Sequence, residues 1–342
     1  MGERANLILV ESGKYQLFYN HWCANTIYRD LFWGVEHAVE FIRAQEEVDE
    51  SGWLDEVWAE GGAVVDLDNR VFLIFETEDI ASDVRLRRVY LDVLREVWQG
   101  WQVRWAYEGI ADMADYVGFP RENVLNVLVE EDVRQFEVLQ QQELRWLDTV
   151  ASIVTEDKAV KLFPLGACTQ EYLYNGSPLP AAMREYQGLE HLTIADGTMD
   201  GNAAAFPSGG FHLDVVARTL EFWAARVLPN IENRMRRKWQ GWSVQSHRDR
   251  FEFQAERTSG RLRFPTGFER DFKTEIETKL LGDMAKSGAE LFLKTVQAHL
   301  ESGQEVKVNP WAMADVRLDV DLMRRQEILN RAFEALSHKQ KN

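Results

Sequence analysis

Cysteine is scarce in this chain: Cys23 and Cys168 are the only two among 342 residues. Two cysteines make no disulfide framework, and neither lies in a CxxC or Cys/His spacing, so we expect no metal site. Long apolar runs are also missing. The N-terminal segment holds only the short run 7–10, without a cleavable signal pattern, and no stretch reaches the roughly 18 residues of a membrane span. These absences predict a cytoplasmic protein that does not contact a membrane.

Familiar catalytic motifs are absent as well. The chain has no P-loop, no dinucleotide-binding glycine loop, no GxSxG and no HExxH. The segment His21-Trp22-Cys23-Ala24-Asn25 holds the residue types of a thiol nucleophile system, but such partners normally converge from distant segments. We therefore interpret Cys23 and Cys168 as equivalent small buried residues, and we expect no cofactor.

Basic residues are outnumbered by acidic ones, 39 to 56, which gives a formal net charge of −17. A field of this sign repels phosphate backbones and disfavours nucleic-acid binding. The one basic cluster, 234–238, lies near the end of a predicted helix, where cations are ordinary. An acidic surface suits a basic protein partner, because complementary charge steers the encounter.

The chain does contain three short sequences that each occur twice, in the same order. The first is Gly34-Val35-Glu36-His37, which recurs as Gly188-Leu189-Glu190-His191. The second is Gly61-Gly62 followed by Asp66 and Arg70, which recurs as Gly209-Gly210 followed by Asp214 and Arg218. The third is Trp98-Gln99-Gly100-Trp101, which recurs as Trp239-Gln240-Gly241-Trp242. Such internal repetition predicts a tandem duplication of one folded unit.

Periodicity predicts an α+β fold with two pseudo-symmetric units. The first, 1–119, holds hairpins over 7–19 and 63–75 and an amphipathic helix over 86–97. An apolar stripe predicts a connecting helix over 120–155. The second unit, 156–265, is expected to hold a hairpin over 211–223, a helix over 229–238, and strands over 242–246 and 251–256. A C-terminal helical region follows over 266–342.

The duplicated motifs supply the candidate site residues. Adjacent helical residues point about 100° apart, so neither Glu36 with His37 nor Glu190 with His191 can cooperate through adjacency, and a structural role is favoured. Asp66 with Arg70, and Asp214 with Arg218, are predicted to form diagonal ion pairs across their hairpins. His21 and His212 lack a repeated counterpart and are interpreted as incidental. The binding candidates are Glu36, Arg70, Glu190 and Arg218, and the catalytic candidates, if the protein is an enzyme, are His37 with Asp66 and His191 with Asp214.

Three functions remain open on these grounds. Strong negative charge without a catalytic motif favours a non-catalytic protein that masks a basic partner, as immunity or antitoxin-type proteins do. The second is a hydrolase or transferase with a cleft between the two units. The third is a scaffold subunit that self-associates through its leucine-rich helices. The sequence leaves the oligomeric state open.

Overall fold

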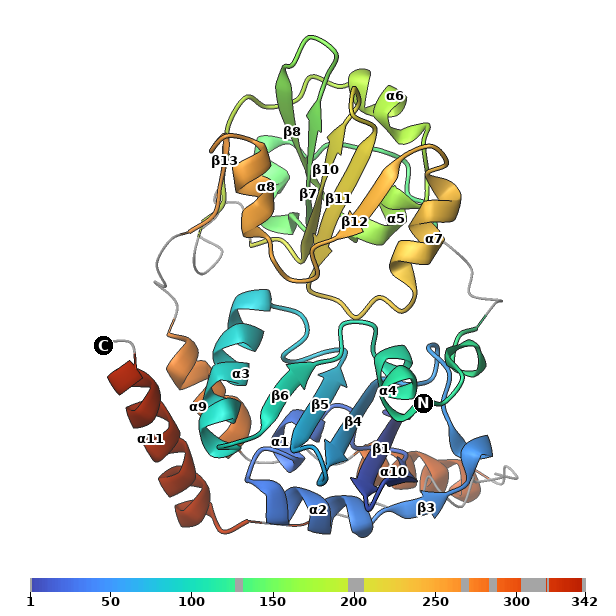
Figure 1. Cartoon of the computed structure of the whole chain (residues 1–342), viewed down its shortest axis with the longest axis vertical. Helices are drawn as coiled ribbons and strands as arrows, with labels where there is room; N and C mark the ends of the chain where they lie inside the picture. The colour runs from blue at the N-terminus through green and yellow to red at the C-terminus, as the bar shows by residue number, and fades with distance from the viewer. Residues whose placement is uncertain are drawn as a thin grey trace. The chain divides into compact units, whose positions relative to one another are not determined.

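The structure is a computed structural model that describes residues 2–126, 132–195, 206–265, 271–282, 288–302, 318 and 320–339. The chain divides into two compact units (Figure 1). Unit 1 comprises Met1–Ala81, Arg85–Val127 and Lys273–Asn342, and unit 2 comprises Ser82–Val84 and Leu128–Phe272. Each unit combines one mixed β-sheet with helices, which confirms the α+β prediction.

Unit 1 is built on a six-stranded sheet of order β3-β2-β1-β4-β5-β6. Its strands are β1 (Ala5–Glu11), β2 (Lys14–Asn20), β3 (Glu46–Val48), β4 (Gly61–Asp66), β5 (Val71–Glu76) and β6 (Gln102–Trp105). Its helices are α1 (Ile27–Asp30), α2 (Val35–Arg43), α3 (Val84–Val97) and α4 (Ile110–Val117), followed near the C-terminus by α9 (Phe272–Leu281), α10 (Gly288–Glu301) and α11 (Leu322–Lys339).

Unit 2 is built on a five-stranded sheet of order β12-β11-β10-β7-β8. Its strands are β7 (Thr149–Val154), β8 (Val160–Leu165), β10 (Gly209–Asp214), β11 (Thr219–Ala224) and β12 (Ser243–Ser246), with a separate parallel pair formed by β9 (Leu192–Thr193) and β13 (Leu262–Arg263). Its helices are α5 (Thr169–Leu173), α6 (Leu179–Arg184), α7 (Ile231–Lys238) and α8 (Glu252–Arg257).

The two sheets share one topology, as a tandem duplication predicts. Strands β2-β1-β4-β5-β6 correspond to β8-β7-β10-β11-β12, each with the same sequence of antiparallel and parallel pairings. The register matches as well: Ala5 pairs with Gly61 in unit 1, and Thr149 pairs with Gly209 in unit 2. Residues of the two units can therefore be placed in equivalent positions.

The second glycine of each pair is needed because a helix packs closely on the sheet there. A Cβ added at Gly62 would lie 2.5 Å from Met113 Sδ on α4, too close for any side chain. A Cβ added at Gly210 would lie 2.5 Å from Trp223 Nε1 and would also clash with Gln254 on α8. The two glycines thus have the same steric role in both units.

The two WQGW segments form the same turn. Gly100 and Gly241 each have a φ of 79°, in the left-handed region that favours glycine. The rings of Trp98 and Trp101 are 5.0 Å apart and edge-on, and those of Trp239 and Trp242 are 5.1 Å apart in the same arrangement. Each turn leads from a helix into the last strand of its sheet.

The arginine of the hairpin motif supports that strand through its backbone. Arg70 has a φ of 54°, and its carbonyl accepts a hydrogen bond of 2.8 Å from the amide of Gln102. Arg218, with a φ of 52°, accepts the same bond of 2.8 Å from Ser243. The hairpin and the WQGW turn therefore form one connected structure, which explains why both motifs are found in both units.

The third repeated sequence is not equivalent in the two units. Gly34 precedes α2, and Val35 and Glu36 begin that helix. Leu189, by contrast, follows α6 and forms an isolated antiparallel bridge with Leu162 on β8, which is the place that Val48 of β3 takes beside β2. The likeness of GVEH and GLEH is thus a coincidence of sequence rather than a trace of the duplication.

Two predicted elements are replaced by others. The described residues of 120–155 hold 3-10 turns at Arg121–Asn123 and Gln141–Trp146 and then β7, but no α-helix. Of the stripe residues that the structure describes, Val124, Phe136 and Leu144 are buried, whereas Val133 is 56% exposed. The spacing of these residues therefore only imitates a helical stripe. The predicted strand over 251–256 is helix α8, which is too short for its periodicity to be recognised.

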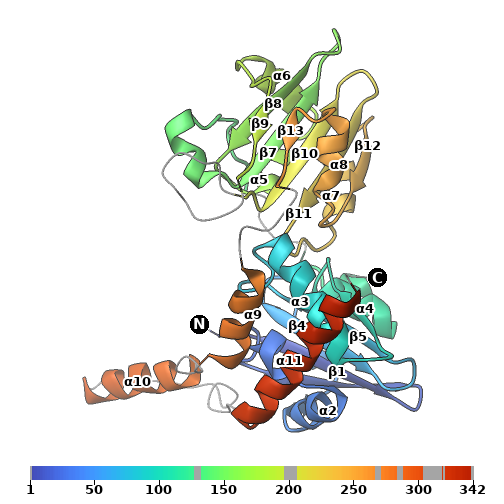
Figure 2. The same ribbon diagram turned by 90° about the vertical axis from the view of Figure 1, so that its left-hand side faces the viewer.

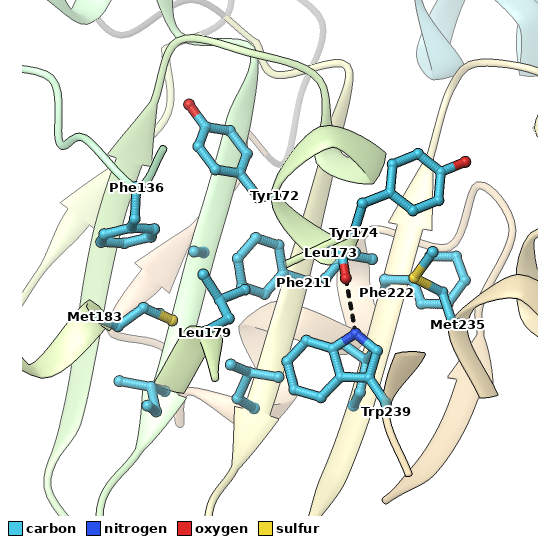
Figure 3. Close-up of a cluster of buried hydrophobic side chains, with 14 of the residues drawn as sticks. Phe136, Tyr172, Leu173, Tyr174, Leu179, Met183, Phe211, Phe222, Met235 and Trp239 are labelled. Carbon is cyan, nitrogen blue, oxygen red and sulfur yellow. Dashed lines mark hydrogen bonds between the residues drawn. The ribbon is translucent and has the colours of Figure 1, made fainter. Parts of the chain in front are cut away.

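The main core of unit 2 lies on the face of its sheet that α5, α6 and α7 cover (Figure 3). Trp239 of the WQGW segment is almost fully buried there, and its Nε1 donates a hydrogen bond of 2.9 Å to the Leu173 carbonyl. Helix α8 packs on the opposite face of the sheet, where Gln254 donates hydrogen bonds to the carbonyls of Val150 and Phe211.

Helices α9 and α11 pack on the rest of unit 1 (Figure 2). Lys279 on α9 is 2.6 Å from Asp79, and the Arg325 guanidinium on α11 lies over the Trp33 ring. Within the described part of the chain, no helix has the length and apolarity required to cross a bilayer.

Candidate polar site in unit 2

A row of polar side chains crosses the sheet of unit 2 on the face that α8 covers. Ser152 on β7, His212 on β10 and Glu221 on β11 are register partners, so their side chains share this face. Their residues are 0%, 3% and 6% exposed. Ser152 Oγ and His212 Nδ1 form a hydrogen bond of 2.9 Å.

Helix α8 completes the cluster with a fully buried Gln254. Its amide nitrogen donates to Ser152 Oγ and to the carbonyls of Val150 and Phe211, at 3.1, 2.9 and 2.8 Å. Its amide oxygen accepts a bond of 2.9 Å from Trp223 Nε1. All polar atoms of this side chain are thus satisfied, as burial requires.

Glu221 carries the buried negative charge of the cluster. Arg257 donates to both carboxylate oxygens, at 2.6 and 2.9 Å, and His247 Nε2 lies 2.9 Å from one of them. Burial alone would raise the pKa of Glu221, but the hydrogen bonds from Arg257 and His247 outweigh burial and hold it below its usual value. Glu221 is therefore ionised at neutral pH.

A pocket of about 300 Å³ opens beside this cluster. Burial lowers the pKa of His212 to about 4, so its ring is neutral at pH 7. The carboxylate of Asp214, at the end of β10, accepts a bond of 2.8 Å from the Ala217 amide and is only half-buried. The pocket is lined by His212, Asp214, Thr219, Leu220, Glu221, Ser243, Gln245 and Arg257.

The positions of unit 1 that correspond to this cluster are apolar. The register places Ile8, Val64 and Leu73 where unit 2 has Ser152, His212 and Glu221. The glycine contacts likewise place Met113 and Phe75 where unit 2 has Gln254 and Trp223. The fold therefore forms without this polar cluster, and the cluster is a feature of unit 2 alone.

No family model matches the chain, and neither a curated protein nor a solved structure is similar to it. Its chemistry has to be argued from the residues themselves.

The catalytic candidates of unit 1 do not form a pair. Asp66 accepts hydrogen bonds from the amides of Asp68 and Asn69 and from Tyr116 Oη, which hold its pKa below the usual value although burial opposes them. His37 lies on α2, where burial lowers its pKa and its Nε2 has no hydrogen-bond partner. Arg70 forms its hydrogen bond through the backbone, so the predicted ion pair with Asp66 is replaced by the turn that Asp66 organises.

Of the unit 2 candidates, only Asp214 belongs to the site. His191, Glu190 and Arg218 are exposed, and no hydrogen bond joins His191 to Asp214. Asp214 accepts from the Ala217 amide rather than from Arg218, so this diagonal ion pair is absent too. The remaining binding candidate, Glu36, lines a different pocket in unit 1.

Both cysteines are buried, and neither forms a disulfide. Burial raises the pKa of the Cys168 thiol to about 12, which keeps it protonated and unreactive. Among the described residues, no group of three or more His, Cys, Asp or Glu side chains could hold a metal ion.

His212, Glu221 and Gln254 were not predicted as site residues from the sequence. His212 was interpreted as incidental because it has no repeated counterpart. That difference between the units is itself the sequence signal for the polar cluster. An aligned pair of units shows polar residues in the second where the first has valine, leucine and methionine.

Proposed function

We propose that the protein is a non-catalytic binding protein that masks a basic protein partner, as immunity or antitoxin-type proteins do, and that the unit 2 pocket receives a cationic side chain of that partner. The observation that supports this most is the charge of the pocket. Asp214 and Glu221 contribute two negative charges, Arg257 contributes one positive charge, and His212 is neutral, so an excess of negative charge faces an incoming side chain. The net charge of −17 would steer a basic partner towards the protein.

The hydrogen bonding of the cluster favours binding over catalysis. Ser152 is fully buried, and Gln254 covers its hydroxyl, so a substrate does not reach it. Both oxygens of Glu221 are engaged by Arg257 and His247. A pocket whose polar groups are fixed in this way is preorganised for recognition.

The test compares two variants that remove the same charge. Asp214→Asn removes the pocket carboxylate, while Glu185→Gln removes an exposed carboxylate just after α6 and serves as the control. Wild type and both variants would be used as bait at low and moderate salt, and the affinity for any retained basic protein would be measured by calorimetry. We expect Asp214→Asn to weaken binding about tenfold, or about 1.4 kcal/mol, and Glu185→Gln to change it less than twofold.

Two results would overturn the proposal. One is recovery of no basic protein at low salt from a host lysate or from the products of neighbouring genes. The other is equal binding by Asp214→Asn and Glu185→Gln, which would show that only the overall charge matters.

A further inference from the structure

Unit 1 has a pocket of its own, of about 360 Å³. It lies between the beginning of α2, the WQGW segment that follows α3, and α11. Its lining residues are Trp33, Gly34, Val35, Glu36, Glu96, Val97, Trp98, Gln99, Ile328, Arg331 and Ala332.

A buried carboxylate lies in the wall of this pocket. The side chain of Glu96 is 7% exposed, and its Oε1 is 2.5 Å from Nζ of Lys339. Lys339 ends α11 and leaves 70% of its side chain exposed. A buried carboxylate requires a cationic or hydrogen-bonding partner, so Glu96 provides a strong position for an ammonium group.

The rest of the lining suits the remainder of a lysine side chain. Glu36 adds a second carboxylate, which is exposed in the first turn of α2. Val35, Val97 and Ile328 are half-buried and offer apolar surface to a methylene stem. The one cation of the lining, Arg331, is 2.6 Å from Glu327 on its own helix.

The duplication does not account for this carboxylate. The WQGW segments align Trp98 with Trp239, which places Arg237 in unit 2 where unit 1 has Glu96. Unit 2 thus has a cation at the position where unit 1 has the buried anion.

We propose that the unit 1 pocket binds the ammonium group of a lysine side chain from the basic partner. In the free protein, Lys339 forms an ion pair with Glu96 and acts as an internal competitor for that site. This inference rests on the proposed function for the origin of the lysine. The C-terminal end of α11 therefore sets the affinity of the pocket, because an incoming lysine has to displace Lys339 before it binds Glu96.

The probe is Nα-acetyl-lysine methylamide, titrated into the full-length protein and followed by the indole NMR signals of Trp33 and Trp98, which line the pocket. Lys339→Ala removes the competitor and is expected to tighten probe binding at least fivefold. Glu96→Gln removes the carboxylate and is expected to weaken it about tenfold. Glu334→Gln, on the exposed side of α11, is the charge-matched control and is expected to change binding less than twofold.

The double variant Lys339→Ala/Glu96→Gln tests the competition itself. It is expected to bind as weakly as Glu96→Gln alone, because removal of Lys339 helps only if Glu96 is the site. The norleucine analogue of the probe, which lacks the ammonium, is expected not to bind. Unchanged binding in Lys339→Ala, or equal binding by Glu96→Gln and Glu334→Gln, would overturn the inference.

The two proposals fail in different ways. If a basic partner is retained and depends on Asp214 but not on Glu96, the pocket inference is wrong and the proposed function stands. If the lysine probe binds through Glu96 while no basic protein is retained, the proposed function is wrong and the ammonium site stands.

Discussion

Units 1 and 2 place different chemistry on one sheet face. Under α4 of unit 1 the positions equivalent to the polar cluster are apolar, with Val64 and Leu73 on the central strands. Under α8 of unit 2 the same positions hold His212 and Glu221, both buried and hydrogen-bonded. Replacing a buried polar network by apolar residues of similar volume is often neutral or stabilising, so the network is not needed for the stability of the topology. The comparison therefore supports the proposal that this face of unit 2 takes part in binding.

The most damaging single change to this face is expected at Gln254. Gln254→Met introduces the unit 1 residue but leaves the Trp223 indole without its acceptor and removes the donor to the Val150 and Phe211 carbonyls. An unsatisfied buried group costs roughly 1–3 kcal/mol, so we expect unit 2 to lose about 3 kcal/mol of stability. Hydrogen–deuterium exchange of the β10 and β11 amides would measure the loss.

A graft of the other unit 1 residues should reverse this effect. The four changes Ser152→Ile, His212→Val, Trp223→Phe and Gln254→Met remove the polar partners together, and we expect them to recover at least half of the loss. Met113→Leu in unit 1 is the control and should cost less than about 1.5 kcal/mol. The equivalence of the two faces would be refuted if the graft were less stable than Gln254→Met alone.

The pH dependence of the two units should differ because of His212. Its pKa is lowered by burial from 6.5 to about 4, so the folded state binds its proton less readily than the unfolded state does. The resulting stability is present above pH 6.5 and is lost as the pH falls from about 6.5 towards 4. Between pH 7 and pH 5 we expect a loss of about 2 kcal/mol from unit 2.

The position equivalent to His212 holds Val64, which does not titrate. In unit 1, burial lowers the pKa of His37, and this shift acts in the same direction. Amide exchange measured at pH 7 and pH 5, corrected for intrinsic rates, would separate the units. The four-residue graft should abolish most of the unit 2 effect, and persistence of the effect in the graft would exclude His212 as its source.

Local signals in the sequence were sufficient for the hairpins over 7–19, 63–75 and 211–223 and for helices such as α3 and α7. The short helices α1, α4, α5 and α6 were not predicted. The hairpin predicted over 63–75 is β4 and β5, and the amphipathic pattern over 86–97 is α3. Each of these elements is long, regular and bounded by turn residues. The strand β7 was missed because the connecting helix predicted from the apolar stripe was extended to residue 155 and so covered it. The structure instead pairs β7 antiparallel with β8 and parallel with β10.

The candidate site was harder to predict because it depends on register. Ser152, His212 and Glu221 come from three strands, and Gln254 and Arg257 from a helix predicted as a strand. Their hydrogen bonds follow from pairings that join residues about 60 and 100 positions apart. Asp214 was found because it belongs to a repeated motif. The unrepeated members could be recognised only once the units were aligned strand by strand.

The smallest predicted effect tests what the units share. Gly100→Ala and Gly241→Ala each force a side chain into a backbone with φ of 79°, and an added Cβ would stay 4.0 and 3.8 Å from the nearest arginine nitrogen. There is no steric clash in either turn, so only the left-handed backbone is penalised, at roughly 1–2 kcal/mol. We expect equal losses in the two units, within about 0.5 kcal/mol, by amide exchange of β6 and β12. Unequal losses would mean that the two WQGW turns stabilise their sheets to different degrees despite their matching geometry. The differences between the units would then extend beyond the sheet face under α8.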